Sequence, residues 1–307
     1  MADFTLAVNL CFVRKRWTEP ADWARLVRQD LGLDVVEFCS DLLDPLLVSE
    51  PARTRLAHET RAAFGEAGVA INDYYTGVIT HCLNLLSHPE EALRADGMRW
   101  CTAAADLALE LGTRMIGGHF DTIPVPDWAD PARNAAAVDR LVASMQAVAR
   151  YGATRGLEAV LWEQMYTPGE VPHTIEEARE LHARVNDGAA LPIHLTLDVG
   201  HACNLHYPHA ERDRDPYAWL EALAHVSPVI HLQQTDGTSS HHWPFTDEYN
   251  ARGIIKPERV LEAVERSGSV ANTLTFEIFH SLGHTEQTVL DDHKRSVEYW
   301  RRALARW

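Results

Sequence analysis

Short apolar runs alternate with longer amphipathic stretches from one end of the chain to the other. An apolar run of about four to eight residues is typical of a buried strand, whereas apolar positions three or four residues apart predict a helix. The pattern predicts strands over residues 5–11, 34–39, 70–75, 115–120, 157–163, 193–198, 229–234 and 273–279. It predicts helices over residues 21–31, 52–67, 90–112, 131–153, 174–186, 216–226, 256–268 and 288–304.

Eight strand–helix alternations over 307 residues predict an α/β protein built as a single (β/α)8 TIM barrel. A doubly wound sheet is the alternative, because it gives the same alternation with fewer strands. No glycine-rich dinucleotide fingerprint follows the first predicted strand, which weakens that alternative. No low-complexity stretch or linker interrupts the chain, so we expect residues 1–307 to form one domain.

The charge and the cysteines narrow the class of protein. With 28 basic and 44 acidic side chains the formal net charge is −16, which argues against a protein that binds nucleic-acid phosphates. The cysteines, Cys11, Cys39, Cys82, Cys101 and Cys203, show no paired spacing, which is typical of reduced thiols. The sequence contains no signal-like segment and no apolar stretch of membrane-spanning length. We therefore expect a cytoplasmic protein.

Four polar residues stand at or near the ends of four successive predicted strands: Glu163, Asp198, His231 and Glu277. The ends of parallel strands meet at one mouth of a barrel, so these side chains are expected to converge there. The structural alternative is that each acid caps a following helix. However, no helix pattern starts directly after the first three residues, and unpaired carboxylates are costly unless a cation compensates them. The set therefore predicts a site for one divalent metal ion.

Three carboxylates and one imidazole form an oxygen-rich site, for which we expect Mn²⁺, with Mg²⁺, Co²⁺ or Zn²⁺ as alternatives. Such an ion can bind two adjacent oxygens of a hydroxyketone, polarise its carbonyl and stabilise an enediolate. A carboxylate beside the metal can remove the proton as a general base. With Glu163 and Glu277 on opposite sides of the barrel, the proton could leave on one face and return on the other, which is epimerisation.

The ordered set of Glu163, Asp198 with His201 in the motif DVGH, His231 and Glu277 resembles the xylose isomerase-like barrel superfamily. This superfamily includes sugar isomerases and epimerases, inosose dehydratases and apurinic endonucleases, and the resemblance covers essentially the whole chain. By resemblance to its ketose 3-epimerases, Glu163 and Glu277 are both metal ligands and acid/base catalysts. The same resemblance implies that Asp198 and His231 are ligands and that His201 touches the substrate.

The sequence also departs from the ketose 3-epimerases of this group. Those enzymes carry a substrate-binding glutamate a short way after the first ligand and an arginine after the histidine ligand. Glu170 could serve as the glutamate, but the segment QQTDG after His231 holds no arginine. This departure argues against free hexuloses as substrates.

Further polar residues are expected at the barrel mouth. His119 ends the fourth predicted strand, where it would contact the substrate or a second metal, or bond to a neighbouring loop. His241, His242 and Trp243 lie in the loop after the seventh strand and are further candidates for substrate contact. Asn9 lies inside the apolar first strand, where its amide needs a partner and could face a sugar hydroxyl.

One dense basic cluster, Arg14, Lys15 and Arg16, follows the first predicted strand. On the catalytic face it could hold a phosphate by charge-assisted hydrogen bonds, and Lys256 is a weaker second candidate. The alternative is a solvated charge run before the first helix. The C-terminal half, with HLQQTDG, HWPFTDEYN and DDHKRSVEYW, is also similar to barrel proteins of tetritol catabolism. That resemblance implies epimerisation of a tetrulose phosphate.

We therefore expect a metal-dependent epimerase or isomerase of a small ketose or ketose phosphate. Its partners would be a small carbohydrate and further copies of itself in a dimer or tetramer, with no nucleic acid or membrane. The alternatives are a lyase of 3-keto sugars, such as a C-glycoside deglycosidase subunit, and a 3-oxo sugar acid decarboxylase. An apurinic endonuclease is disfavoured, because its three-zinc site needs a histidine where the third strand has Asn72, Asp73 and Tyr74.

Overall fold

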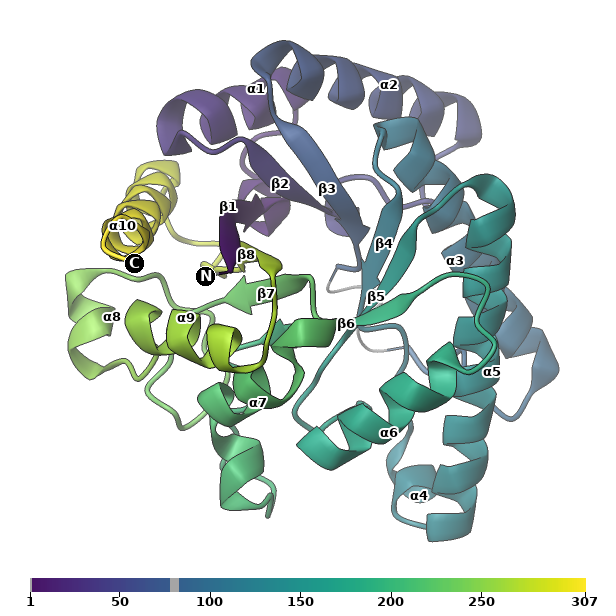
Figure 1. The fold of residues 1–307 in the computed structure, drawn as a ribbon. Helices are drawn as coiled ribbons and strands as arrows, with labels where there is room; N and C mark the ends of the chain where they lie inside the picture. The colour runs from purple at the N-terminus through teal and green to yellow at the C-terminus, as the bar shows by residue number, and fades with distance from the viewer. Residues whose placement is uncertain (1, 78–82) are drawn as a thin grey trace.

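Eight parallel strands form a closed barrel in the computed structural model, which describes residues 2–77 and 83–307 (Figure 1). Each strand pairs with the next one along the chain, and β8 pairs with β1. This topology confirms the predicted (β/α)8 barrel and excludes the doubly wound sheet, whose edges stay open. The strands are β1 Asp3–Asn9, β2 Val35–Cys39, β3 Ala70–Tyr75, β4 Met115–Gly118, β5 Ala159–Glu163, β6 Ile193–Asp198, β7 Val229–Leu232 and β8 Ala271–Phe276.

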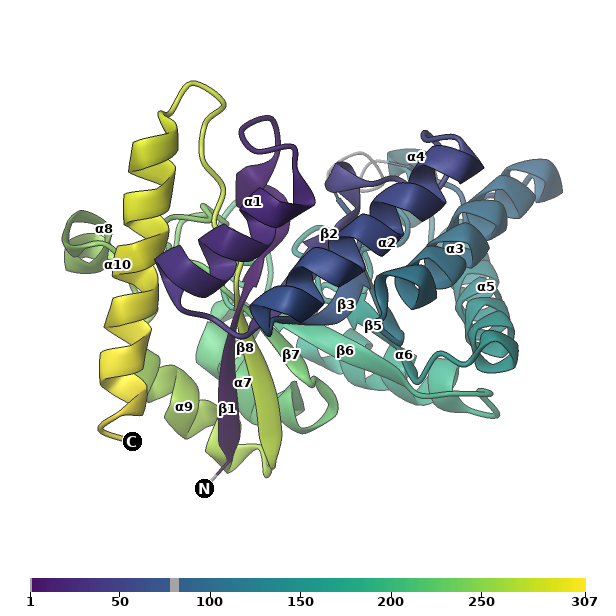
Figure 2. The same cartoon turned by 90° about the horizontal axis from the view of Figure 1, so that it is seen from above.

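Helices surround the barrel, and the long C-terminal helix α10 stands beside the first strand and the last (Figure 2). The described helices are α1 Pro20–Arg25, α2 Glu50–Ala67, α3 Glu91–Leu111, α4 Val125–Trp128, α5 Pro131–Arg155, α6 Ile175–Asn186, α7 Pro216–Leu223, α8 Asp247–Arg252, α9 Pro257–Arg266 and α10 Glu286–Leu304. The first predicted helix is split, because α1 runs on into a wider π-helical turn over Leu26–Leu31. Helices α4 and α8 lie in loops where the sequence pattern predicts no helix.

Helix starts follow local sequence signals. Asp130 precedes α5 and accepts hydrogen bonds from the backbone N–H groups of Ala132 and Arg133, at 2.9 and 3.1 Å. Pro131 takes the first helical position, where an N–H would have no partner inside the helix. Thr174 caps α6 in the same manner. These caps fix where each helix leaves the loop that carries the strand end before it.

The barrel interior changes from apolar to polar along the strands. Tyr75, Leu161 and Val229 form a small apolar cluster of their own. Two residues further along β5 and β7 come Glu163 and His231, which lie on the same face because side chains in a strand recur every second residue. The strand alternation therefore delivers polar side chains to the carboxyl ends of the barrel strands.

Helix α10 carries a buried histidine whose protonation should oppose folding. The Nδ1 atom of His293 is 2.8 Å from the Val289 carbonyl oxygen, and its Nε2 atom has no hydrogen-bond partner among the described residues. Burial, with Arg16 and His280 acting in the same direction, lowers the pKa of His293 to about 3. An unfolded histidine has a pKa of about 6.5, so the unfolded state binds more protons between these two values. Stability should therefore fall as the pH falls through this range.

We expect the free energy of unfolding to decline from about pH 7 to about pH 4, and to decline less steeply in a His293→Phe variant. Urea titrations at a series of pH values would measure both slopes. His58→Gln, at an exposed position of α2, is the matched control and should keep the wild-type slope. If His293→Phe showed the wild-type slope, the buried neutral histidine would not be the cause.

Four cysteines are buried and form no disulfide, namely Cys11, Cys39, Cys101 and Cys203, whereas Cys82 lies outside the described residues.

Among residues 2–77 and 83–307, no helix is long and apolar enough to cross a membrane.

Candidate metal centre at the barrel mouth

The four predicted metal ligands converge at the carboxyl ends of the strands. Glu163 and Asp198 are the last residues of β5 and β6. His231 lies within β7, and Glu277 follows β8 directly. Each residue offers a ligand atom within 4.8 Å of the others, and all four side chains are buried. The barrel thus brings four residues that are far apart in sequence into one compact donor set.

His231 lies between the carboxylates of this set. Its Nδ1 atom is 3.0 Å from Glu163 Oε1 and 3.4 Å from Glu277 Oε2. Burial alone would lower the pKa of His231, but the surrounding carboxylates, Glu37 first among them, raise it well above its usual range. For the Glu277 carboxylate, burial acts in the opposite direction and would raise the pKa. The His231 imidazole outweighs this effect and holds the pKa of Glu277 below its usual range. Glu277 is therefore ionised at neutral pH.

Asp198 has one satisfied and one unsatisfied oxygen. Its Oδ1 atom accepts hydrogen bonds from the backbone N–H groups of Gly200 and His201, at 2.6 and 3.0 Å, and from Gln233 Nε2 at 2.8 Å. Its Oδ2 atom is buried and has no hydrogen-bond partner among the described residues. An orphaned carboxylate oxygen is costly in a protein interior. A cation beside Oδ2 would remove that cost, so the residues present fit a divalent metal ion.

Gln233 links the metal cluster to the loop after β7. Its side-chain oxygen accepts from the His242 backbone N–H at 2.6 Å, and its Nε2 is 2.9 Å from Ser240 Oγ. The glycine of the DVGH motif makes room for this amide, because a Cβ atom on Gly200 would lie 2.1 Å from Gln233 Cδ. The small residue between Asp198 and His201 is therefore required by packing.

A second group, Asp198, His201 and His242, also has the spacing of a metal site. However, the Gln233 side-chain amide contacts two residues of this group. Gln233 Nε2 donates to Asp198 Oδ1 at 2.8 Å and lies 3.2 Å from His242 Nε2. Since this amide N–H₂ group lies against the His242 Nε2 lone pair, which a cation would need, the four-residue cluster is the better metal site.

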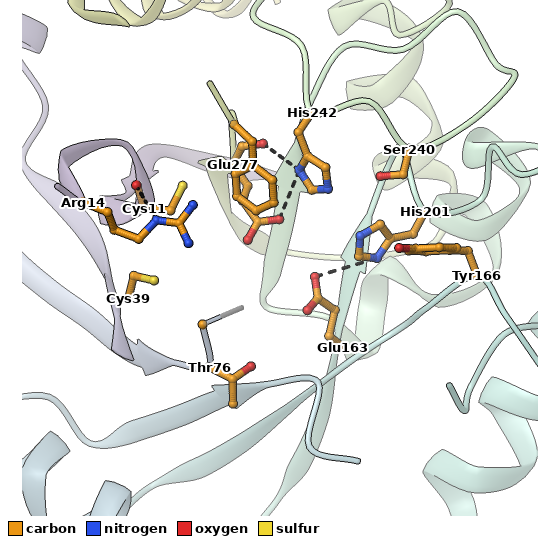
Figure 3. A pocket seen from close by; sticks show the side chains of 12 residues that line it. Cys11, Arg14, Cys39, Thr76, Glu163, Tyr166, His201, Ser240, His242 and Glu277 are labelled. Carbon is orange, nitrogen blue, oxygen red and sulfur yellow. Dashed lines mark hydrogen bonds and ion pairs between the residues drawn. The ribbon is translucent and has the colours of Figure 1, made fainter. Parts of the chain in front are cut away.

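A cavity of about 280 Å³ adjoins the cluster (Figure 3). Glu163 and Glu277 both line it, and their carboxylates point into it from the end of β5 and from just past β8. This volume is at the small end of the range for ligand pockets, which suits a small substrate. The other lining residues are Cys11, Arg14, Cys39, Thr76, Gly77, Tyr166, His201, Ser240, His242 and Phe279.

Two histidines present their rings to this cavity. His201 Nδ1 is 2.8 Å from the Gln164 carbonyl oxygen, and His242 Nδ1 is 3.0 Å from that of Glu277. Since a carbonyl oxygen can only accept, each ring carries its proton on Nδ1 when neutral. His201 Nε2 is then an acceptor, which suits the substrate contact that the sequence resemblance implies for this residue.

The predicted basic cluster is divided by the structure. Arg14 lines the cavity and pairs with Asp41, and it is the only lysine or arginine among the described lining residues. Lys15 and Arg16 instead donate to backbone carbonyls of the loop after β8, at Leu282 and Ser281. Of the three basic residues, the structure therefore places Arg14 in the described cavity lining and ties Lys15 and Arg16 to the loop after β8. The weaker candidate, Lys256, donates to the Asn250 carbonyl oxygen and does not line the cavity.

His119 does not line the cavity either. It borders a separate small apolar hollow with Trp100 and Phe120. The strand ends at Gly118, whose φ of 134° is open to glycine but rarely to other residues. The chain therefore changes direction just before His119, and the alternation of the strand no longer predicts where its side chain points.

Two other predicted contacts lie outside the cavity lining. Trp243 stacks on His241 with ring centroids 4.0 Å apart, and Arg252 lies over the indole at 4.2 Å. Asn9 is buried behind the cluster, where its Nδ2 atom is 3.4 Å from Glu277 Oε1. Asn9 thus has the hydrogen-bond partner that its burial requires, and this partner is a protein side chain rather than a sugar hydroxyl.

Glu170 also stays outside the lining. It accepts a hydrogen bond from Thr167 Oγ1 at 2.7 Å within its own loop.

Glu37 and Tyr166 are among the site residues that sequence reasoning missed. Glu37 is fully buried within β2 and contacts His231 Nε2 at 3.0 Å. Its signal was a charged residue between Val36 and Phe38 in an apolar run, since such a residue needs a partner. Tyr166 lines the cavity from the loop after β5, with its ring 5.0 Å from that of His201. No local pattern distinguishes it from an ordinary loop tyrosine.

Comparisons with known proteins agree with this architecture. The D-erythrulose 1-phosphate 3-epimerase of Brucella abortus is 30% identical over 298 residues, which is 96% of this chain and 95% of that protein. A crystal structure from Rhodospirillum rubrum, of a protein named provisionally as a xylose isomerase, is 28% identical with a TM-score of 0.90 and covers 97% of this chain and 99% of that one. The D-psicose 3-epimerase of Clostridium cellulolyticum is 15% identical, with a TM-score of 0.73 over 98% of this chain and 99% of that one, which shows a shared fold.

The match to a family model covers most of the barrel. The model of the xylose isomerase-like TIM barrel matches residues 26–303, from the π-helical turn after α1 to the last turn of α10. Together with the relative that is 30% identical over nearly the whole chain, this match is decisive. The chain belongs to the xylose isomerase-like TIM barrel family.

Proposed function

We propose that this protein is a divalent-metal-dependent epimerase of a small ketose phosphate, and specifically of a tetrulose phosphate. The observation that carries the proposal is that Glu163 and Glu277 line one cavity and belong to one metal-type cluster. The relative from Brucella abortus, named for the 3-epimerisation of D-erythrulose 1-phosphate, supports the substrate class.

The residues divide the work of epimerisation among them. Glu163, Asp198, His231 and Glu277 would hold the cation, for which three carboxylates and one imidazole favour Mn²⁺. When bound, the cation would polarise the substrate carbonyl and stabilise the negative charge that develops as the adjacent C–H bond is broken. Glu163 or Glu277 takes the proton from one face of the carbon, and the other carboxylate returns a proton to the opposite face.

Arg14 is the residue to which we assign the phosphate. It supplies the one lysine or arginine in the described cavity lining, and its side chain is 25% exposed. A guanidinium group donates several N–H bonds in one plane, which suits a phosphate even when one edge is already paired with Asp41. His201, Tyr166 and Ser240 would contact the hydroxyl groups of the sugar.

Solvent deuterium exchange followed by NMR tests the proposal. The Mn²⁺-loaded protein would be incubated in D₂O with ketoses and ketose phosphates that include the tetrulose phosphates. We expect deuterium to enter at the carbon beside the carbonyl while the epimer appears, and to do so fastest with a tetrulose phosphate. An Arg14→Met variant should lose the preference for phosphorylated members and keep exchange with unphosphorylated ones.

The other outcomes are informative. Exchange with unphosphorylated ketoses alone would support an epimerase whose substrate carries no phosphate. No exchange with any compound, in protein shown to hold metal, would favour a lyase of 3-keto sugars or a 3-oxo sugar acid decarboxylase, which could use the same site.

A further inference from the structure

Glu37 is a fully buried carboxylate that the proposed proton transfers do not use. It lies in β2 with no exposed surface. Its neighbours in the barrel register are Asn9 of β1 and Asp73 of β3. The pairing of β2 with β3 shifts by one residue between Val36 and Glu37. Such an irregularity re-aims a side chain locally, and it occurs here at the strand position that faces the metal cluster.

Both carboxylate oxygens of Glu37 reach the same atom. His231 Nε2 is 3.0 Å from Glu37 Oε1 and 3.1 Å from Glu37 Oε2. The other ring nitrogen, Nδ1, faces Glu163 and Glu277 on the cluster side. The imidazole therefore stands between Glu37 on one edge and the proposed metal ligands on the other.

Asn9 holds Glu37 in place. The Asn9 side-chain oxygen accepts from the Cys11 backbone N–H at 2.7 Å, which settles the orientation of its amide. Its Nδ2 atom must therefore point the other way, where it is 2.6 Å from Glu37 Oε1 and 3.4 Å from Glu277 Oε1. Asn9 thus ties the buried carboxylate of β2 to a carboxylate of the cluster.

Both ring nitrogens of His231 lie 3.0 Å from a carboxylate oxygen, but Glu163 and Glu277 would bind the cation, which leaves Glu37 to accept the proton of the neutral imidazole. With Nε2–H donating to Glu37, the lone pair is left on Nδ1, which faces the cluster. Without Glu37, the proton could sit on Nδ1 and block that ligand position. An ion pair that only stabilised the fold would need a negative charge near His231. It would not need both Glu37 oxygens to contact Nε2, the ring nitrogen on the side away from the cluster.

We propose that Glu37 is a positioning residue that fixes His231 in the metal-binding tautomer and orientation. The inference rests on the metal site of the proposed function, and it adds a requirement for a residue that touches neither metal nor substrate. Partners of this kind on metal-ligating histidines are typically worth about 10–100-fold in metal affinity.

The test is a titration of metal affinity, measured by calorimetry or by the Mn²⁺ resonance signal rather than by activity. We expect Glu37→Gln to raise the dissociation constant for Mn²⁺ by about 10-fold or more. Asp127→Asn is the matched control, since Asp127 is also a buried carboxylate, but its ion-pair partner is Arg133 of α5. We expect its affinity to stay within about 3-fold of wild type, well below the effect of a lost ligand partner.

The outcomes separate this inference from the function it rests on. Wild-type protein that does not bind Mn²⁺ would overturn the metal site itself. Wild-type protein that binds Mn²⁺ no more tightly than Glu37→Gln would overturn only the role of Glu37. Equal weakening in Glu37→Gln and Asp127→Asn would show that loss of any buried carboxylate has this effect, and would also overturn the role of Glu37.

A measurement on the unmutated protein guards against a variant that does not fold. Long-range proton–nitrogen NMR spectra of the histidine rings, recorded on the Zn²⁺-loaded chain, report which nitrogen carries the proton. We expect His231 to be protonated on Nε2. A proton on Nδ1, or metal bound through Nε2, would overturn the proposal.

Discussion

Replacing Glu277 with glutamine is expected to lower the turnover number by about 10³-fold, and Glu163→Gln should have a similar effect. Both carboxylates line the cavity, and both contact His231, at 3.4 and 3.0 Å. Glutamine keeps the shape of the side chain but can neither take nor return a proton. Rates with the tetrulose phosphate that exchanges fastest in wild type would measure the effect, in protein shown to hold metal.

The two variants should also differ from each other. With one carboxylate replaced, the other can still remove and return the proton on its own face. Glu277→Gln should then exchange deuterium into one epimer without inversion, and Glu163→Gln into the other epimer. Glu180→Gln, on the exposed side of α6, is the control and should turn over like wild type. A metal-loaded Glu277→Gln enzyme with the wild-type rate would contradict the mechanism with two carboxylates.

Removing the metal is expected to abolish activity and to lower stability. Glu163, Asp198 and Glu277 are buried together, and Asp198 Oδ2 has no hydrogen-bond partner among the described residues. A cation that binds only the folded state offsets this repulsion, and at a free concentration of 100 times its dissociation constant it adds about 2.7 kcal/mol of stability. Dialysis against a chelator, followed by unfolding curves with added Mn²⁺, Mg²⁺, Co²⁺ or Zn²⁺, would measure the gain and rank the ions.

A substitution localises this effect. Asp198→Asn keeps an acceptor for the N–H groups of Gly200 and His201 but removes the charge at the orphaned oxygen. We expect it to lose most of the metal-dependent gain in stability. Asp139→Asn, which is 69% exposed on α5, should keep the full gain. Activity that survives complete chelation, without any shift in the unfolding curve on adding metal, would remove the metal from the proposed function.

The convergence of the four cluster residues could be predicted from sequence because it depends on only two properties of the chain. Each of Glu163, Asp198 and Glu277 lies at or just past the end of an apolar run, and each run is a strand. In a barrel of parallel strands, all such ends lie at one mouth, whatever the loops between them do. The prediction therefore needed only the alternation of strands and helices and the positions of the strand ends. It did not need the paths of the loops.

Residues outside the strands could not be placed in this way. Arg14 and Lys15 are adjacent in sequence, yet one lines the cavity and the other bonds to the loop after β8. His119 follows a glycine with a φ of 134°, after which the strand alternation no longer applies. The path of a loop depends on contacts with distant segments, so neither spacing nor residue type decides which way these side chains point.

Glu37 shows the same division within a strand. The sequence by itself determined the eight-strand alternation and the polar residues at the strand ends. It also determined that a charge in an apolar run must find a partner inside the barrel. Only the tertiary structure decided that this partner is His231, 194 residues away, and that Glu37 approaches its Nε2 rather than its Nδ1. The physical reason is that alternation sets which face of the sheet a side chain occupies, whereas barrel closure and strand register set which side chains meet there.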